Sequence, residues 1–296
     1  MVQEITGSQA LAMGAIEAGV QFVNGYPGSP STSVVDALLH MASDRMRIEW
    51  AINEKSAFDA ALGGSLAGIR SLLCLKSVGL NVALDSLMVS NLAAGDGGFV
   101  ILVGDDPGGW GSQNEQDSRP LVAAAEIPLL EPTSVADARA VMRQAFDLSE
   151  RFRVPVAVRI TRALVLDRTE THLPHDPAPR PRAGTFKRQG DRFNVLPIHV
   201  VDMHRRLQAT LGEVQALFEE SPLNNGGEEK TSHGVIAAGY GYQKLAQVLA
   251  QADHPPLRIL RLATLHPLPE RRIQGFLRDL KSILVLEETA PSVSYT

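Results

Sequence analysis

Two short segments place groups that could do chemistry directly after predicted strands. Residues 24–32, NGYPGSPST, combine glycines that permit close backbone approach with a helix start that presents free amides. This segment can bind an anion, or it can be a proline-fixed turn in which a serine or threonine caps the helix. Residues 50–55, WAINEK, place the Glu54 carboxylate at the mouth of a parallel sheet. In a purely structural alternative, Asn53 caps the helix and Glu54 complements its dipole.

A third segment, residues 105–117, is a polar run, DDPGGWGSQNEQD, that follows a predicted buried strand. Its carboxylates could hold a divalent ion, although a solvated acidic loop is the commoner meaning of such a run. Residues 95–97 read Gly-Asp-Gly, which we interpret as a turn, because Asn114 comes too early to complete a metal-diphosphate motif. His172 and His175 have no further ligands nearby in the sequence. We therefore predict no metal site in this chain.

The elements that must position these segments follow from the apolar pattern. From residue 7 to about 165, short apolar runs alternate with stretches of helical period, which is typical of a parallel sheet with crossover helices. The predicted strands cover residues 20–24, 47–52, 71–76, 98–104 and 154–160, and the predicted helices cover 8–18, 34–41 and 134–150. Several strands are apolar on both parities, as expected for strands buried on both faces. The sequence therefore predicts an α/β fold.

A change of composition divides the chain. Residues 168–196 are rich in proline and arginine, which predicts a linker. A second α/β unit is expected after it, with helices at 198–220, 242–252 and 270–280, strands at 234–239, 257–261 and 282–287, and a loop at 222–232. We therefore predict one domain over residues 1–167, a linker over 168–196 and a smaller domain over 197–296.

Composition excludes several classes of protein. The chain has 296 residues, 44% of them hydrophobic and 21% charged, with a formal net charge of -5, so nothing attracts it globally to nucleic acid or to an anionic membrane. Because Cys74 is the only cysteine, the chain cannot form an internal disulfide or hold an iron–sulfur cluster by itself. The start lacks the basic residues of a signal peptide, and no apolar stretch approaches the roughly 18 residues of a membrane helix. We expect a cytoplasmic protein that binds neither nucleic acid nor membrane.

Several segments together carry a resemblance to a known family. In order they are YPGSPST (26–32), NEKSAFDAALGGSLAG (53–68), LKSVGLN (75–81), DDPGGWGSQNEQDSR (105–119), IPLLEPTSVADA (127–138), LHPLPE (265–270) and LVLEE (284–288). The chain closely resembles the alpha subunits of indolepyruvate:ferredoxin oxidoreductases, which are thiamine-diphosphate-dependent 2-oxoacid:ferredoxin oxidoreductases. The resemblance implies a parallel-sheet, pyrimidine-binding domain followed by a transketolase C-terminal-like domain. The implied activity is oxidative decarboxylation of an aryl 2-oxoacid, such as indolepyruvate, to its acyl-CoA.

The same resemblance implies roles for individual residues. Glu54 matches the carboxylate that lies against N1′ of the cofactor's aminopyrimidine and favours its imino tautomer, which makes it the implied catalytic residue. Ser29 matches the position whose hydroxyl approaches the substrate carboxylate. The other implied cofactor-binding residues are Tyr26, Pro27, Gly28, Lys76 and Asn81, and the other implied substrate-binding residues are Ser112, Gln113 and Asn114.

Parts of the family's machinery are not found in these 296 residues. The family's large subunit continues into a diphosphate- and magnesium-binding domain and a cysteine-rich segment. We therefore expect thiamine diphosphate to be shared with a partner subunit that supplies Mg²⁺ and [4Fe-4S] clusters, in a homo- or hetero-oligomer that uses ferredoxin and coenzyme A. Two alternatives stay open: the same chemistry on another 2-oxoacid, such as pyruvate or 2-oxoglutarate, and a non-catalytic scaffold or regulatory module that kept the fold.

Overall fold

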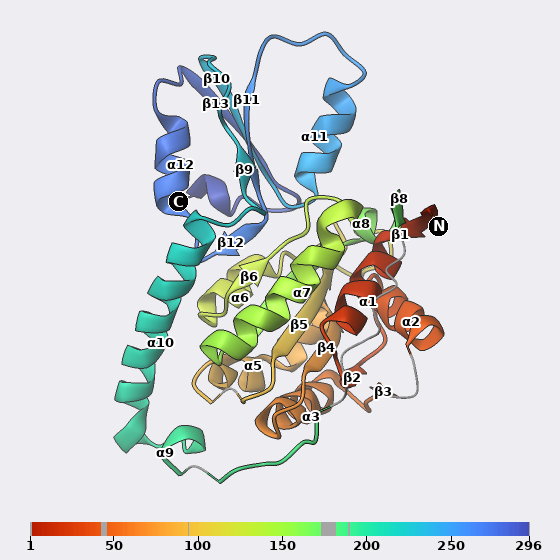
Figure 1. Cartoon of the computed structure of the whole chain (residues 1–296), viewed down its shortest axis with the longest axis vertical. Coiled ribbons are helices and arrows are strands. Elements are labelled where there is room, and N and C mark those ends of the chain that lie inside the picture. Colours follow the sequence, from red (N-terminus) through yellow and green to blue (C-terminus); the bar gives the residue numbers. More distant parts are fainter. Residues whose placement is uncertain (1, 43–45, 94, 173–181, 189, 296) are drawn as a thin grey trace.

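The chain forms a large sheet covered by helices and a smaller sheet beside it (Figure 1). The computed structural model describes residues 2–42, 46–93, 95–172, 182–188 and 190–295. The large sheet has seven strands in the order β12-β6-β7-β5-β4-β2-β3. These strands are β2 (Phe22–Gly25), β3 (Arg47–Trp50), β4 (Ser71–Lys76), β5 (Phe99–Asp105), β6 (Leu129–Leu130), β7 (Val156–Thr161) and β12 (Thr264–His266). All neighbouring strands are parallel except β12, which runs antiparallel to β6, so the predicted α/β class is confirmed.

Helices cover both faces of the large sheet. One face carries α1 (Gly7–Glu17), α2 (Thr32–Met41) and α7 (Val135–Phe152). The other carries α3 (Glu54–Leu66), α4 (Ser77–Val82), α5 (Leu84–Ser90) and α6 (Arg119–Ala124). Successive residues of a strand point to opposite faces, so Leu72 joins the first hydrophobic cluster and Leu73 the second. All residues of β4 are buried, which confirms the expected burial on both faces.

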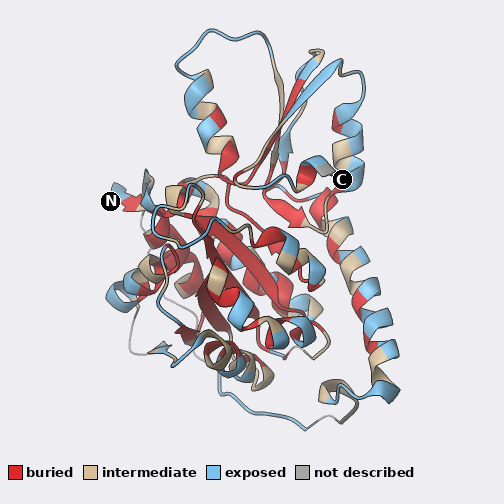
Figure 2. Ribbon diagram, turned by 180° about the vertical axis from the view of Figure 1, so that it is seen from behind, coloured by how far each residue is buried: buried red, intermediate tan, exposed pale blue. Residues whose placement is uncertain are grey.

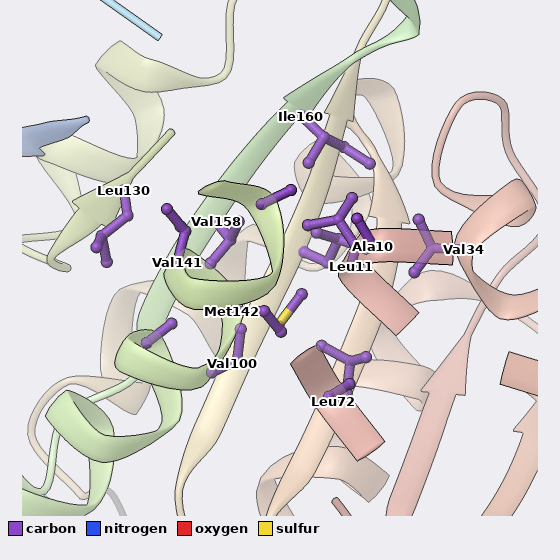
Figure 3. Packing of buried hydrophobic residues seen from close by; sticks show 14 of the residues in the cluster. Ala10, Leu11, Val34, Leu72, Val100, Leu130, Val141, Met142, Val158 and Ile160 are labelled. Carbon is purple, nitrogen blue, oxygen red and sulfur yellow. The ribbon is translucent and has the colours of Figure 1, made fainter. Parts of the chain in front are cut away.

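The hydrophobic core fixes where the strands end. Figure 3 shows Val141 and Met142 of α7, with Leu11 of α1, packed over Val100 and Val158 of the sheet. Figure 2 shows the central strands of the large sheet buried and the outer surfaces of the helices exposed, and β4, β5 and β7 are buried along their whole length. Each fully buried aliphatic side chain contributes about 1.5–3 kcal/mol. The core therefore holds the strand ends, and the loops that follow them, in a fixed frame.

Capping residues explain why two of the core helices begin where they do. The Thr6 hydroxyl accepts from the Gln9 amide at 3.2 Å, and the Gln9 side chain accepts from the Thr6 amide at 2.9 Å. Ser134 and Asp137 form the same reciprocal pair at the start of α7. These pairs satisfy amides that have no partner within the helix, so α1 and α7 start at defined residues.

The second unit is built around a four-stranded sheet in the order β13-β10-β11-β9. Its strands are β9 (Asn225–Gly226), β10 (His233–Ala238), β11 (Arg258–Leu262) and β13 (Ser282–Leu286), with helices α10 (Pro197–Glu219), α11 (Gly241–Leu249) and α12 (Glu270–Leu277) and the short 3-10 helix Val293–Tyr295. The predicted helices and strands of this part are present, and the predicted loop contains β9. In the described part of the chain, no helix combines the length and the apolar character needed to cross a membrane.

Some elements were not predicted from the sequence. The strand β8 (Arg168–His172) occupies the start of the predicted linker and pairs antiparallel with β1 (Val2–Thr6), while α8 (Arg162–Leu166) and α9 (Gly190–Phe193) are short helices. Pairing between distant segments, not local composition, makes β1 and β8 strands. Residues 182–188 are exposed and irregular. Residues 173–181, which include His175, lie outside the described residues.

A buried arginine joins the second unit to the large sheet. Arg159 of β7 is fully buried, and its guanidinium donates to Asp105 at 2.5 Å and to Glu131 at 2.6 Å. It also donates to the Thr289 hydroxyl at 3.0 Å. Since a buried charge is costly unless it is paired and hydrogen-bonded, this arrangement ties residues after β13 to the carboxyl ends of β5 and β7.

A second buried arginine, Arg119, also links the second unit to the loop after β5. Arg119 donates from Nη2 to Asp117 at 2.7 Å and from Nη1 to Glu287 at 3.0 Å. Its Nη2 also donates to the Glu288 carbonyl at 2.9 Å. The two arginines therefore hold the same segment of the second unit against the loop that leaves β5.

The Glu131 carboxyl gives this junction a pH dependence. Burial is the main cause that raises the pKa of Glu131 from 4.5 to about 7, against the opposing effect of Arg159. As the pH rises, the Glu131 carboxyl loses its proton near pH 4.5 in the unfolded chain and only near pH 7 in the folded chain. The contribution of Glu131 to the free energy of unfolding is therefore fully present below pH 4.5 and is lost as the pH rises to about 7. Relative to Glu131→Gln, the wild-type free energy of unfolding should fall by up to about 1.4 kcal/mol per pH unit across this window. Urea unfolding of both proteins at stepped pH measures the difference, and equal pH profiles would contradict the prediction.

Candidate active site

The sequence-predicted site residues follow four strands that end at one edge of the large sheet. Glu54 begins α3 after β3, and residues 26–29 follow β2. Lys76 is the last residue of β4, and a loop that we call the rim loop, residues 106–117, follows β5. Because β3, β2, β4 and β5 are neighbours and parallel, their carboxyl ends lie side by side, which is where α/β folds bind ligands.

Glu54 has an unengaged carboxylate in a close-fitting place. Asn53 is the N-cap of α3, and its side chain accepts from the Ser56 amide at 2.8 Å, so the capping interpretation of this segment is confirmed. Glu54 is half-buried, and a Cβ atom on Gly79 would lie 2.7 Å from its Cγ and 2.9 Å from its Oε1. Its side chain has no hydrogen bond or ion pair to any other described residue. A hydrogen-bond donor that reaches this edge can therefore bind the carboxylate directly.

Lys55, the next residue along α3, differs from Glu54 in that its side chain is hydrogen-bonded to other residues of the chain. Lys55 donates to Asp85 at 3.0 Å and to the Ser86 hydroxyl at 2.8 Å. The hydrogen bond to Asp85 is the main cause that raises the pKa of Lys55. Its ammonium is therefore occupied by α5 and leaves the Glu54 carboxylate uncompensated.

Residues 26–31, which lie between β2 and α2 and which we call the proline loop, are held by hydrogen bonds within the segment and to Thr32. The Gly28 amide donates to the Thr32 hydroxyl at 2.8 Å, and the Ser31 hydroxyl donates to the Gly28 carbonyl at 2.8 Å. Ser31 is the N-cap of α2 by position, but its side chain makes no capping hydrogen bond to the helix. Ser29 is exposed and has no side-chain hydrogen bond within the described residues, so its hydroxyl is available at the edge.

Gly28 and Lys76 are in contact, whereas Tyr26 and Pro27 face outward. A Cβ atom on Gly28 would lie 2.8 Å from the Lys76 Cβ, so glycine allows the proline loop to lie against the lysine stem. Lys76 is only 9% exposed, and its Nζ donates to the Gly111 carbonyl at 3.0 Å. Tyr26 and Pro27 are exposed. The structure thus joins the loops after β2, β4 and β5 through one lysine.

The rim loop brings only some of its predicted residues into this network. The Ser112 hydroxyl donates to Asp106 at 2.8 Å, whereas Gln113 and Asn114 are exposed and have no hydrogen bonds to other described residues. Asn81 exchanges two amide hydrogen bonds, at 2.8 and 2.9 Å, with Gln116.

Three residues of this site, Gly79, Asp106 and Gln116, lie in segments that the sequence singled out, but the sequence did not indicate the contacts that each of them makes. Only Gly79 has a recognisable feature in the sequence, because a glycine early in a helix often allows another group to approach the backbone closely. Asp106 and Gln116 give no comparable signal, since only their contacts in the fold distinguish them from other polar loop residues.

The other polar candidates lie apart from this edge or form no site. Asp96, of the Gly-Asp-Gly turn, precedes β5 at the opposite end of the sheet and accepts from Arg192 at 2.7 Å. In the ranges that the structure describes, no group of three or more histidine, cysteine or carboxylate side chains is arranged to hold a metal ion. Cys74 is buried in β4, and burial raises the pKa of its thiol.

The chain is similar to known proteins over nearly its whole length. The chain is 35% identical over 295 residues to indolepyruvate oxidoreductase subunit IorA from Pyrococcus abyssi and 36% identical over 298 aligned positions to that from Archaeoglobus fulgidus. These matches cover 98% of this chain but 46% and 47% of the relatives, so the chain spans about half of their length. It also superimposes with a TM-score of 0.81 on the solved structure of 2-oxoglutarate:ferredoxin oxidoreductase from Magnetococcus marinus, at 18% identity, over 99% of this chain and 59% of that one.

The likeness to that solved structure concerns the fold alone, because the identity is low. The family assignment comes from the sequence model of pyruvate flavodoxin/ferredoxin oxidoreductases, thiamine diphosphate-binding, which matches residues 13–204. That range contains Glu54, the proline loop, Lys76 and the rim loop. The chain therefore belongs to this thiamine diphosphate-binding family.

Proposed function

We propose that this chain is the cofactor-activating component of a thiamine-diphosphate-dependent 2-oxoacid:ferredoxin oxidoreductase. The observation that carries the proposal is the Glu54 carboxylate, which is half-buried against Gly79 at the carboxyl edge of the sheet and has no partner among the described residues. A carboxylate in this state fits the aminopyrimidine of thiamine diphosphate, whose ring nitrogen needs a group that holds a proton. Membership of a thiamine diphosphate-binding family supports the same choice.

The residues of the site have different roles in this proposal. Thiamine diphosphate, when bound, supplies the electron sink for decarboxylation of a 2-oxoacid. Glu54 holds and moves the proton at N1′ of the pyrimidine, which is a task for a positioned acid–base group. Gly28, Lys76 and Asn81 form the wall that faces the cofactor, together with Tyr26 and Pro27.

The substrate side of the site is formed by hydroxyl and amide groups. In this proposal the Ser29 hydroxyl binds the substrate carboxylate, and its exposure leaves it available for that contact. Ser112, Gln113 and Asn114 contribute the rim of the substrate site. Ser112 is already held in the rim loop by Asp106, whereas the exposed amides of Gln113 and Asn114 leave both free to contact a substrate or a partner subunit.

The surroundings of Glu54 support a partner subunit. Ile52 is 87% exposed, Val82 is 51% exposed, and Met88 and Val89 of α5 are also exposed. These apolar side chains belong to segments next to Glu54 or to helices that pack on α3. Exposed apolar side chains gathered in one region indicate an interface. We propose that a partner in a homo- or hetero-oligomer covers them and supplies the diphosphate-binding domain, Mg²⁺ and [4Fe-4S] clusters.

The remaining parts of the proposal concern the whole enzyme. Residues 1–167 serve as the pyrimidine-binding domain and residues 197–296 as the transketolase C-terminal-like domain, joined by residues 168–196. The enzyme oxidises an aryl 2-oxoacid of the indolepyruvate kind to its acyl-CoA in the cytoplasm, with coenzyme A as acceptor of the acyl group and ferredoxin as acceptor of electrons. The names of the IorA relatives support the aryl substrate.

Reconstitution tests this proposal. The chain is combined with a candidate partner subunit that carries a diphosphate-binding domain and clustered cysteines, and CoA-dependent reduction of ferredoxin is measured with indolepyruvate, phenylpyruvate, pyruvate and 2-oxoglutarate. We expect the two aryl acids to give the highest kcat/KM. Preference for pyruvate or 2-oxoglutarate would overturn the substrate assignment. A complex that binds no thiamine diphosphate in calorimetric titration would instead leave a scaffold role.

A further inference from the structure

Asp106 is a buried carboxylate directly after β5. It is 3% exposed, and its Oδ2 accepts from the Gly111 amide at 2.7 Å and from the Ser112 hydroxyl at 2.8 Å. Its Oδ1 is buried and has no hydrogen-bond partner among the described residues. A carboxylate that is only half satisfied inside a protein is costly, so its two hydrogen bonds to the rim loop must offset that cost.

Gly111 is held from two sides. Its amide donates to Asp106, and its carbonyl accepts from the Lys76 ammonium at 3.0 Å. Lys76 has no ion pair with a described residue, so the Gly111 carbonyl is the acceptor that holds this ammonium. The hydrogen bonds therefore run from Asp106 through Gly111 to Lys76 and connect the ends of β5 and β4.

The glycine-rich part of the rim loop has few other restraints. The Gly109 amide donates to the Asp106 carbonyl at 2.9 Å, and the Gly108 amide donates to the exposed Glu115 carboxylate at 3.0 Å. Gly108 and Gly109 both adopt positive φ, at 83° and 63°, and Trp110 is 75% exposed. Glycine loses more conformational freedom on ordering than any other residue. Trp110 contacts the guanidinium of Arg162, with the Arg162 Cζ 5.1 Å from the ring centroid, but an exposed cation–π contact contributes little.

We infer that Asp106 is a positioning residue, which folds the rim loop onto Lys76 and thereby holds the Lys76 ammonium and the Ser112 hydroxyl at the edge of the site. The loop-folding part of this inference stands on the contacts alone. The part that concerns catalysis rests on the proposed function. Asp106 itself acts through Gly111, Ser112 and Lys76, because at 3% exposed its side chain offers almost no surface for direct contact with a ligand.

Proteolysis of the chain tests the loop-folding part. Chymotrypsin cleaves after Trp110 only when the rim loop opens, and mass spectrometry follows this cleavage. Asp106→Ala removes the oxygen that accepts both hydrogen bonds, so we expect cleavage at Trp110 to be at least about tenfold faster than in the wild type. The matched control is Glu115→Ala, which removes the exposed carboxylate that accepts from the Gly108 amide at 3.0 Å. The control should change the rate less than about twofold; equal rates for the two variants would overturn the inference.

A second variant and a second readout make the result independent of folding failure. Ser112→Ala removes one of the two hydrogen bonds without changing the buried carboxylate, and it should raise the cleavage rate about threefold. The fluorescence anisotropy of Trp110, measured in a Trp50→Phe background, reports the same opening as a fall in anisotropy. If neither Ser112→Ala nor Asp106→Ala alters cleavage or anisotropy, Asp106 does not hold the loop.

Kinetics of the assembled complex test the catalytic part. Asp106→Ala should lower kcat/KM for the 2-oxoacid about tenfold, and Asp106→Asn, which keeps an acceptor oxygen, should restore most of it. Faster cleavage at Trp110 with unchanged kcat/KM would overturn the positioning role while leaving the proposed function intact. Failure of the proposed function is recognised separately, because full turnover by a Glu54→Gln complex would contradict that function whatever the state of the rim loop.

Discussion

Replacing Glu54 by glutamine should lower the turnover of the assembled complex by about 10²–10⁴-fold, which is the usual contribution of a positioned acid–base group. Glutamine has nearly the same shape, so the N-cap by Asn53 and the contact with Gly79 should persist. What is lost is the ability to hold and move a proton at N1′ of the pyrimidine. The expected effect is therefore on kcat, with little change in the affinity for thiamine diphosphate.

Steady-state kinetics and cofactor titration of the same preparation separate these two quantities. The matched control is Glu49→Gln on the preceding strand, whose carboxylate forms an ion pair with Arg47 at 2.5 Å. Removing an exposed ion pair changes stability by about 0–1 kcal/mol, so this variant should retain wild-type turnover. Wild-type turnover in Glu54→Gln would show that Glu54 does not activate the cofactor.

Gly79→Ala should lower turnover by at least about a hundredfold without unfolding the chain. The added Cβ would lie 2.7 Å from the Glu54 Cγ and 2.9 Å from its Oε1, so the carboxylate must move. A displacement of about 1 Å in a catalytic group can cost about 10²-fold in rate. Alanine is favoured over glycine in a helix, so the helix α4 itself should be preserved.

Gly63→Ala in the same helix as Glu54 provides the control. A Cβ atom at Gly63 would meet nothing within 4 Å, so the substitution should stabilise α3 by roughly 0.5–1 kcal/mol and leave turnover unchanged. Thermal unfolding and kcat are measured for both variants. Normal turnover in Gly79→Ala would mean that the Glu54 carboxylate does not need the position that this glycine allows.

Local patterns were sufficient to predict much of the large sheet. Residues 71–76 are predicted as a strand, and β4 has those bounds, because four consecutive apolar residues, 72–75, lie in a short run bounded by turn signals. The start of α3 was equally readable, since Asn53 followed by an acidic residue is an ordinary helix start. The order of strand, cap and helix then places Glu54 at the carboxyl edge without any knowledge of distant contacts.

Pairing between segments that are far apart in the chain could not be predicted from such local patterns. The strands β1 and β8 exist because each supplies the other's hydrogen bonds, and β12 from the second unit joins the large sheet beside β6. Short strands such as β6 and β12 have too few residues to show a period. The proline- and arginine-rich composition around residue 168 indicated a linker because composition does not record pairing.

The sequence by itself determined that an acidic residue stands at a strand-to-helix turn, and that glycine-rich polar loops follow the neighbouring strands. Only the tertiary structure decided that Gly79 lies against Glu54, that Asp106 and Lys76 hold Gly111 from opposite sides, and that Gln113 and Asn114 remain exposed. The physical reason is the range of the forces involved. Capping and periodicity act over a few neighbouring residues, whereas packing and hydrogen bonding between strand ends depend on how the whole sheet is assembled.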